Sequence, residues 1–176
     1  MKTFLLDTNI ASPLLDNEHC NNPAVNKFIE NIDYRKDHLY ISPVVLAEIR
    51  FGYEICFKAD EKRKKNILKG LRHFPVIDIN KHTVPHYANV RSALFKKHGK
   101  GEIKKGFSKI KEKVPEDLID KSTGKSLGIE ENDLWIVACA LQYNMTFVTS
   151  DKMYRLKNIV KDELDLPLEW LVWKKD

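Results

Sequence analysis

Paired cysteines and long apolar stretches are missing from this chain of 176 residues, and each absence excludes a class of protein. The three cysteines, Cys20, Cys56 and Cys139, are widely spaced and form no CxxC pair, so neither a disulfide framework nor a zinc site is indicated. No uninterrupted apolar stretch is long enough to span a bilayer, and Asp7 comes too early for a signal peptide. The sequence therefore predicts a cytoplasmic globular protein with no membrane contact.

Several catalytic motifs are missing as well. His82 and His86 are four apart, but Thr83 stands where a HExxH zinc motif needs Glu. Gly99 and Gly101 lack the strand before them and the helix after them that a phosphate-binding loop requires. No Ser-His or Cys-His arrangement has a recognisable local motif. The chemistry must therefore come from other residues.

Two aspartates each follow a short apolar run. Asp7 directly follows residues 3–6, and Asp151 follows residues 146–149 with Ser150 between them. Such runs, bounded by polar turn residues, are typical of buried parallel strands. In open α/β sheets, ligands bind outside the carboxyl ends of the strands, so both aspartates are predicted at a ligand site.

Two further acids belong to predicted helices. Ser42 and Pro43 are predicted to start a helix that is apolar over most of its surface, and Glu48 is a charge inside it. Asp133 lies in the first turn of a helix predicted at 131–143, which is too apolar for the surface.

Taken singly, each acid has an ordinary explanation as a turn residue, a helix cap or a solvated charge. The four together are hard to explain separately, because a buried unpaired carboxylate is costly. Crowded carboxylates raise one another's pKa unless a cation neutralises them. Ligation by oxygen alone favours Mg²⁺ or Mn²⁺ over zinc, so the set predicts a site for one of these ions.

The apolar pattern predicts strands alternating with helices in one domain, 1–176. Strands are expected near 3–6, 38–42, 74–79, 146–149 and 168–172. Helices are expected near 9–15, 23–32, 43–57, 60–73, 81–98, 131–143 and 152–157. This alternation indicates a mostly parallel sheet covered on both faces. A Lys-rich and Gly-rich stretch at about 99–128 is predicted to be an insertion with short structural elements.

The net charge of +5 is unevenly distributed. Residues 58–114 carry seventeen Lys or Arg and five Asp or Glu, whereas both flanking thirds are acidic. Such a segment attracts phosphate backbones, although it could equally be a solvated face. We predict that four of its lysines contact the phosphate backbone of a polyanionic substrate: Lys104, Lys105, Lys109 and Lys111.

The segments that carry the four acids resemble the PIN-domain nucleases. They are residues 4–9, 45–52, 132–138 and 147–151, and within the family the chain is most similar to the VapC toxins of toxin-antitoxin modules. Each motif is weak alone, but their order and context match at all four acids. The chain departs from the compact family members in length, between Gly99 and Asn132.

The resemblance implies a three-layer α/β/α sandwich with a central, mostly parallel sheet, and Mg²⁺- or Mn²⁺-dependent endoribonuclease activity on RNA. It implies that Asp7, Glu48, Asp133 and Asp151 are the catalytic, metal-site acids. Thr149 would help to order the site, and Thr8 and Asn9 would have a supporting role. It also implies a homodimer and a cognate antitoxin that occludes the active site.

Three alternatives stay open at this stage. The protein could be a PIN-fold nuclease with an RNA-processing or other non-toxin role, or an RNA-binding protein that does not cut. It could also be a small phosphotransfer or phosphatase domain, which would need a nucleophilic Asp and a Lys at a strand end.

Overall fold

A parallel four-stranded sheet forms the centre of the molecule, a computed structural model that describes residues 2–15, 28, 30–33, 35–55, 61–98, 120, 122–166, 168 and 170–172. The strands are β1 (Thr3–Leu6), β2 (His38–Tyr40), β3 (Thr146–Thr149) and β4 (Trp170–Val172), in the order β2-β1-β3-β4. All three pairings are parallel, and Leu5 of β1 lies between Tyr40 and Phe147. The carboxyl ends of β1 and β3 are therefore neighbours, as the sequence predicted.

Burial explains why these runs form strands. Leu5, Leu6, Phe147 and Val148 are all completely buried, as expected for the central strands of a sheet that is covered on both faces. The Asp7 N–H continues the ladder by donating to the Val148 carbonyl at 2.9 Å.

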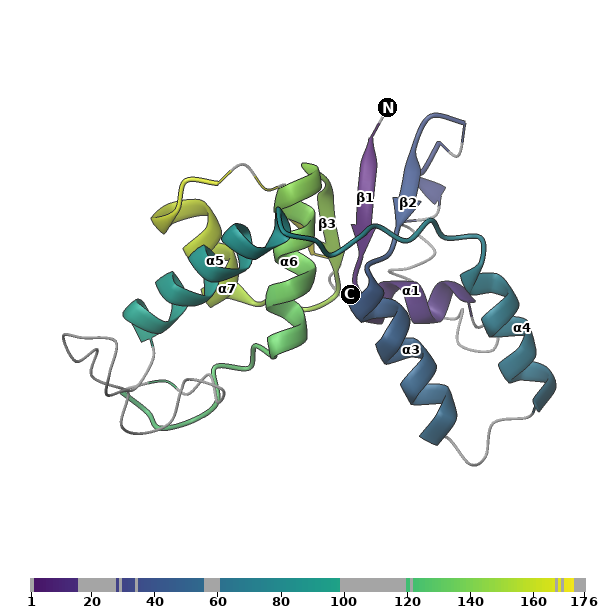
Figure 1. Cartoon of the computed structure of the whole chain (residues 1–176), viewed down its shortest axis with the longest axis horizontal. Helices are drawn as coiled ribbons and strands as arrows, with labels where there is room; N and C mark the ends of the chain where they lie inside the picture. The colour runs from purple at the N-terminus through teal and green to yellow at the C-terminus, as the bar shows by residue number, and fades with distance from the viewer. Residues whose placement is uncertain are drawn as a thin grey trace.

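Helices gather at two sides of the sheet. In Figure 1, α1 (Thr8–Leu15), α3 (Pro43–Ile55) and α4 (Glu61–Leu71) lie at one side of the strands. At the other side lie α5 (Thr83–His98), α6 (Glu131–Tyr143) and α7 (Tyr154–Asn158), and α7 continues into a π-helical turn at Ile159–Glu163. This arrangement confirms the predicted α/β sandwich. None of the helices in the described ranges is long and apolar enough to cross a membrane.

Helix α6 is the buried helix that its composition predicted. Seven of its residues are buried: Leu134, Ile136, Val137, Ala138, Cys139, Ala140 and Leu141. The helix ends at Asn144, whose left-handed conformation (φ 51°) turns the chain directly into β3.

Some predicted elements differ from the structure. The strand expected at 74–79 is only an isolated bridge between Ile41 and Val76, because Val76 is exposed and Ile77 is the one buried residue of the segment. Helix α3 is less covered than its composition suggested, with Phe51 65% exposed. The helix expected from residue 152 begins at Tyr154. Most of the helix expected at 23–32 and most of the insertion at 99–128 lie outside the described residues.

Candidate active site

Asp7 marks the point where β1 turns directly into α1. Its carbonyl accepts the Ala11 N–H at 2.8 Å, which starts the helix, and its side chain is only 4% exposed. One carboxylate oxygen accepts the Thr8 backbone N–H at 2.7 Å, and the other accepts the Thr149 hydroxyl at 2.6 Å. The carboxylate is thus held in place by donors from both central strand ends.

Asn9 joins the ends of β1 and β3. Its side-chain amide nitrogen lies 3.2 Å from an Asp7 oxygen and 2.9 Å from an Asp151 oxygen, and its amide oxygen accepts the Ser150 N–H at 2.9 Å. The Asp151 N–H donates to the Thr149 hydroxyl oxygen at 3.0 Å. Asp7 and Asp151 are therefore both bound to one amide nitrogen.

Glu48 reaches the same area from α3. The Ser42 hydroxyl caps this helix by accepting the Val45 N–H at 3.2 Å, as its position in the sequence predicted. One Glu48 oxygen accepts the Thr8 hydroxyl, and the other accepts the Asn132 side-chain amide at 2.6 Å. Glu48 thus connects α1, α3 and the first turn of α6.

Asp133 is the fourth acid and lies one residue beyond Asn132 in the first turn of α6. Its side chain accepts the Glu130 backbone N–H at 2.7 Å, which satisfies one of the free donors at the helix start. Burial is the main reason why the pKa of this carboxyl rises from 3.8 to about 7. The hydrogen bond from the Glu130 N–H lowers the pKa, and the negative charges of Asp7, Glu130 and Asp151 raise it further.

The pKa of Asp7 is also raised. Burial is the main cause of its rise from 3.8 to about 6, the hydrogen bonds from Thr149 and Thr8 oppose it, and the charges of Asp151 and Glu48 add to it. In the part of the chain that the structure describes, none of the four acids pairs with Lys or Arg. Within the described residues, the four acids therefore form a group of carboxyls without a positively charged partner.

Comparison with known proteins agrees with this geometry. The PIN domain family matches residues 4–160, a range that includes all four acids. The chain belongs to this family. A search of curated protein sequences found no match.

Solved structures show the same fold. VapBC2 from Rickettsia felis, bound to a promoter DNA fragment, and VapBC-1 from nontypeable Haemophilus influenzae are each 22% identical to this chain, with a TM-score of 0.61 over 97% of it and 98% of theirs. VapBC-5 from Mycobacterium tuberculosis, a member of a toxin-antitoxin family, is 16% identical, with a TM-score of 0.57 over 98% and 99%.

The structure brings most of the predicted site residues of this PIN domain into direct contact. Asp7, Glu48 and Asp151 lie in one hydrogen-bonded group with the supporting residues Thr8, Asn9 and Thr149. Asp133 has no hydrogen bond to this group among the described residues, but the charges of Asp7 and Asp151 are close enough to raise its pKa. The catalytic roles of all four acids remain predictions. The four lysines predicted to bind RNA lie outside the described residues.

One polar residue of the group was missed. Asn132 was not predicted as a site residue, although it directly precedes Asp133 at the start of a buried helix. Its position in the sequence could have indicated this, because the side chains of a helix tilt toward the amino-terminal end, and Asn132 and Asp133 share the first turn.

The oxygen donors of the PIN domain fit a hard divalent cation. The four acids supply carboxylate oxygens alone, and burial together with the neighbouring acids raises the pKa of both Asp7 and Asp133. Among the described residues, no three acidic, histidine or cysteine side chains already stand at the spacing of a formed metal site. Binding a cation therefore requires movement of carboxylates that now accept hydrogen bonds.

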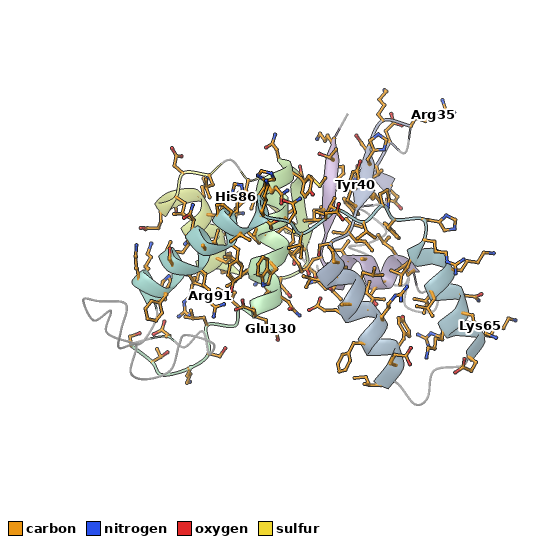
Figure 2. All side chains as sticks on the ribbon, viewed as in Figure 1. Arg35, Tyr40, Lys65, His86, Arg91 and Glu130 are labelled. Atoms are coloured by element: carbon orange, nitrogen blue, oxygen red, sulfur yellow. The ribbon has the colours of Figure 1, made fainter. Side chains whose placement is uncertain are left out.

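A second polar group supports the start of α6 from α5. The Arg91 guanidinium pairs with Glu131, and the Tyr87 hydroxyl donates to the same carboxylate. The Tyr87 ring stacks on Trp135 with centroids 4.0 Å apart and an interplanar angle of 14°. Figure 2 shows Arg91 on α5 on the side of the molecule where Glu130 marks the start of α6. These contacts hold the helical turn that presents Asn132 and Asp133.

Proposed function

We propose that this PIN domain is a metal-dependent endoribonuclease and the toxin of a type II toxin-antitoxin module. The observation that carries the proposal is the convergence of Asp7, Glu48, Asp133 and Asp151 with no cationic side chain paired to them in the described residues. Four carboxylates at the carboxyl edge of a parallel sheet would have little reason to be kept together without a cation.

Each residue has a defined part in this proposal. Asp7, Asp133 and Asp151 would hold Mg²⁺ or Mn²⁺, and Glu48 would bind it directly or hold its water. Such a cation, when bound, would lower the pKa of the attacking water and stabilise the leaving oxygen. Four side chains would keep the acids oriented through the hydrogen bonds described above: Thr8, Asn9, Asn132 and Thr149.

RNA is the substrate that the charge distribution favours. The basic segment 58–114 includes all of α4 and α5, and α5 ends in Lys96, Lys97 and His98. A polyanion needs such a flank to approach an acidic centre. We propose that Lys104, Lys105, Lys109 and Lys111 continue this flank.

The geometry favours metal-dependent hydrolysis over phosphotransfer. Both oxygens of Asp7 already accept hydrogen bonds, from Thr8 on one side and from Thr149 and Asn9 on the other, so neither is presented as a free nucleophile. No Lys among the described residues forms an ion pair with Asp7. The covalent acyl-phosphate of a phosphatase would need both features.

The partner protein is proposed from the relatives. Several solved structures with this fold are toxin-antitoxin complexes, so we propose a cognate antitoxin that covers the acidic site, and a homodimeric nuclease. A short reading frame next to the gene, whose product binds this chain and restores growth of cells that express it, would support the toxin role.

The proposal is tested by a cleavage assay on single-stranded RNA. Cleavage should require Mg²⁺ or Mn²⁺, stop with EDTA and return when either ion is restored, and its products should carry 5′-phosphate and 3′-hydroxyl ends. A 2′,3′-cyclic phosphate product would instead identify the RNA's own hydroxyl as the nucleophile, and full activity in EDTA would overturn the mechanism.

A further inference from the structure

A cavity of about 310 Å³ lies between the segment that precedes α6 and the start of α7. Its walls come from two segments far apart in sequence: Leu127, Gly128 and Ile129 on one side, and Met153, Tyr154 and Arg155 on the other. This volume is at the small end of ligand-binding sites, which hold from roughly 300 to 1,000 Å³. The cavity thus has room for a single small group rather than for an extended molecule.

Both walls of the cavity are tied to catalytic acids. The Ile129 carbonyl carbon is bonded to the Glu130 nitrogen, which donates to Asp133 at 2.7 Å. Met153 follows Asp151 by two residues, a separation of at most about 7 Å between Cα atoms. A strand of RNA with one phosphate at the acids would therefore place an adjoining nucleotide at this cavity.

The lining combines an apolar floor with an exposed ring. Leu127 and Ile129 are buried in the core, whereas the Tyr154 side chain is 61% exposed. Unpaired nucleobases are bound by stacking on aromatic rings next to apolar surface, whereas bases in a duplex have their faces covered. The combination favours a single-stranded ligand.

Arg155 supplies a fixed positive charge at the edge of the cavity. Its Nη2 pairs with the buried Asp120 at 2.9 Å. The other oxygen of Asp120 accepts the backbone N–H groups of Ser122 at 2.8 Å and Thr123 at 3.0 Å. This anchor uses one of the guanidinium's donors, and no further partner for Arg155 is found within the described ranges.

The backbone of both walls takes left-handed conformations. Gly128 has φ 68°, and Met153 has φ 34°, which is uncommon for a residue with a side chain. Such conformations persist where the surrounding structure holds them and occur often at functional sites.

We propose that this cavity is a subsite for one unpaired nucleobase of the RNA beside the scissile phosphate, with Tyr154 as the stacking platform and Arg155 as the contact to its phosphate or polar edge. This inference rests on the proposed ribonuclease function and extends it to a sequence or structure preference at one position. One wall, Leu127 to Ile129, lies at the end of the segment between Gly99 and Asn132 in which the chain is longer than compact family members, so the subsite would be particular to this chain.

The test compares Tyr154→Leu, which keeps apolar bulk but removes the ring, with its matched control Tyr154→Phe, which keeps the ring. The first measurement is binding of a short single-stranded RNA that contains 2-aminopurine, in EDTA, where no cleavage is expected. Tyr154→Leu should raise Kd by about 5- to 100-fold and lose the fluorescence quenching that stacking causes, and Tyr154→Phe should retain both properties. Because Tyr154 is exposed, both variants should melt like the wild type.

The second measurement locates the base. Cleavage in Mg²⁺ first locates the scissile bond, abasic nucleotides are then placed one at a time on either side of it, and the binding of each RNA is measured in EDTA. One position should weaken RNA binding to the wild type by the factor that Tyr154→Leu causes, with no further loss when both changes are combined.

The outcomes separate the two proposals. If Tyr154→Leu binds RNA like the wild type and shows the same abasic penalties, the subsite is wrong and the ribonuclease function stands; a cavity that instead takes a side chain of a partner protein would give this result. If Tyr154-dependent quenching is present but the wild type does not cut RNA in Mg²⁺, the hydrolytic function is wrong and the nucleobase site stands.

Discussion

At the scale of single residues, Asp7 shows how burial and charge oppose each other. It is held by donors from Thr8, Asn9 and Thr149, yet burial still raises its pKa from 3.8 to about 6. A carboxyl that is easier to protonate in the fold than in the unfolded chain favours the folded state at low pH. Its stabilising effect is complete below about pH 4 and is lost as the pH rises through about 6 for Asp7 and about 7 for Asp133.

The first prediction therefore concerns Asp7→Asn. Without metal, the wild type should lose stability between pH 5 and pH 8, and the variant should lose less, because Asn cannot ionise. At about 1.36 kcal/mol per pKa unit, the rise to about 6 sets an upper limit of about 3 kcal/mol for this difference. Urea denaturation in EDTA at both pH values measures it.

Cleavage provides the second readout for Asp7→Asn. Loss of a direct ligand should reduce activity by more than the roughly 10- to 100-fold that a supporting residue of a metal site contributes. Equal pH dependence of stability in both proteins would show that the pKa of Asp7 is not raised in the fold. Near-normal cleavage by the variant in saturating Mg²⁺ would show that Asp7 is not part of the cation site.

The second prediction concerns Asn9→Ala. The Asn9 amide nitrogen donates to both Asp7 and Asp151, and its oxygen accepts the Ser150 N–H. Removal of this side chain should therefore weaken metal affinity by roughly 10- to 100-fold. The lost hydrogen bonds should lower the free energy of unfolding by about 1–2 kcal/mol. Ser92→Ala is the control, because its hydroxyl bonds only to the Asn89 carbonyl on the exposed surface of α5. If both variants bind metal alike, Asn9 has no positioning role.

At the scale of helices and strands, the start of α6 depends on its support by α5. The third prediction is that Arg91→Ala and Glu131→Gln each reduce stability and Mn²⁺ affinity, because each loosens the turn that carries Asn132 and Asp133. A double-mutant cycle should give a coupling energy of about 0.5–3 kcal/mol. Additive effects on stability, with unchanged Mn²⁺ affinity, would show that this contact is only a surface ion pair.

The elements that the sequence predicted well are those with strong local patterns. The strand ends at Asp7 and Asp151 and the helix start near Asp133 are determined by short apolar runs next to polar residues, so their place at one edge of the sheet follows from parallel pairing. The prediction of a strand at 74–79 was wrong. The segment has the apolar pattern of a strand, but its only pairing with the sheet in the described residues is the single bridge at Ile41.

Other features could not be predicted because they depend on distant contacts. Nothing local to Asn132 indicates that its amide reaches Glu48 on another helix, 84 residues away in sequence. The cavity at Tyr154 likewise forms between one segment that precedes α6 in the sequence and another that follows it, and neither segment alone carries a recognisable pattern. The exposure of Phe51 depends on what packs against α3, which its composition does not reveal.

At the scale of the whole molecule, charge separates an acidic centre from a basic flank. The fourth prediction is that replacing Lys104, Lys105, Lys109 and Lys111 with Gln weakens RNA binding and flattens its salt dependence, by about 0.7 in slope for each phosphate that the variant no longer neutralises. The single-turnover rate at saturating RNA should change little. An unchanged salt slope would assign these lysines to a partner protein or to a solvated surface.

The central claim is that Asp7, Glu48, Asp133 and Asp151 form one cation site, and Mn²⁺ binding followed by electron paramagnetic resonance tests it most directly. The wild type should bind Mn²⁺, and Asp7→Asn, Asp133→Asn and Asp151→Asn should each weaken binding strongly, with a smaller effect for Glu48→Gln if it acts through water. Asp162→Asn, at an exposed acid of the π-helical turn, should bind Mn²⁺ like the wild type. Mn²⁺ affinity that is the same in all five variants would contradict the account.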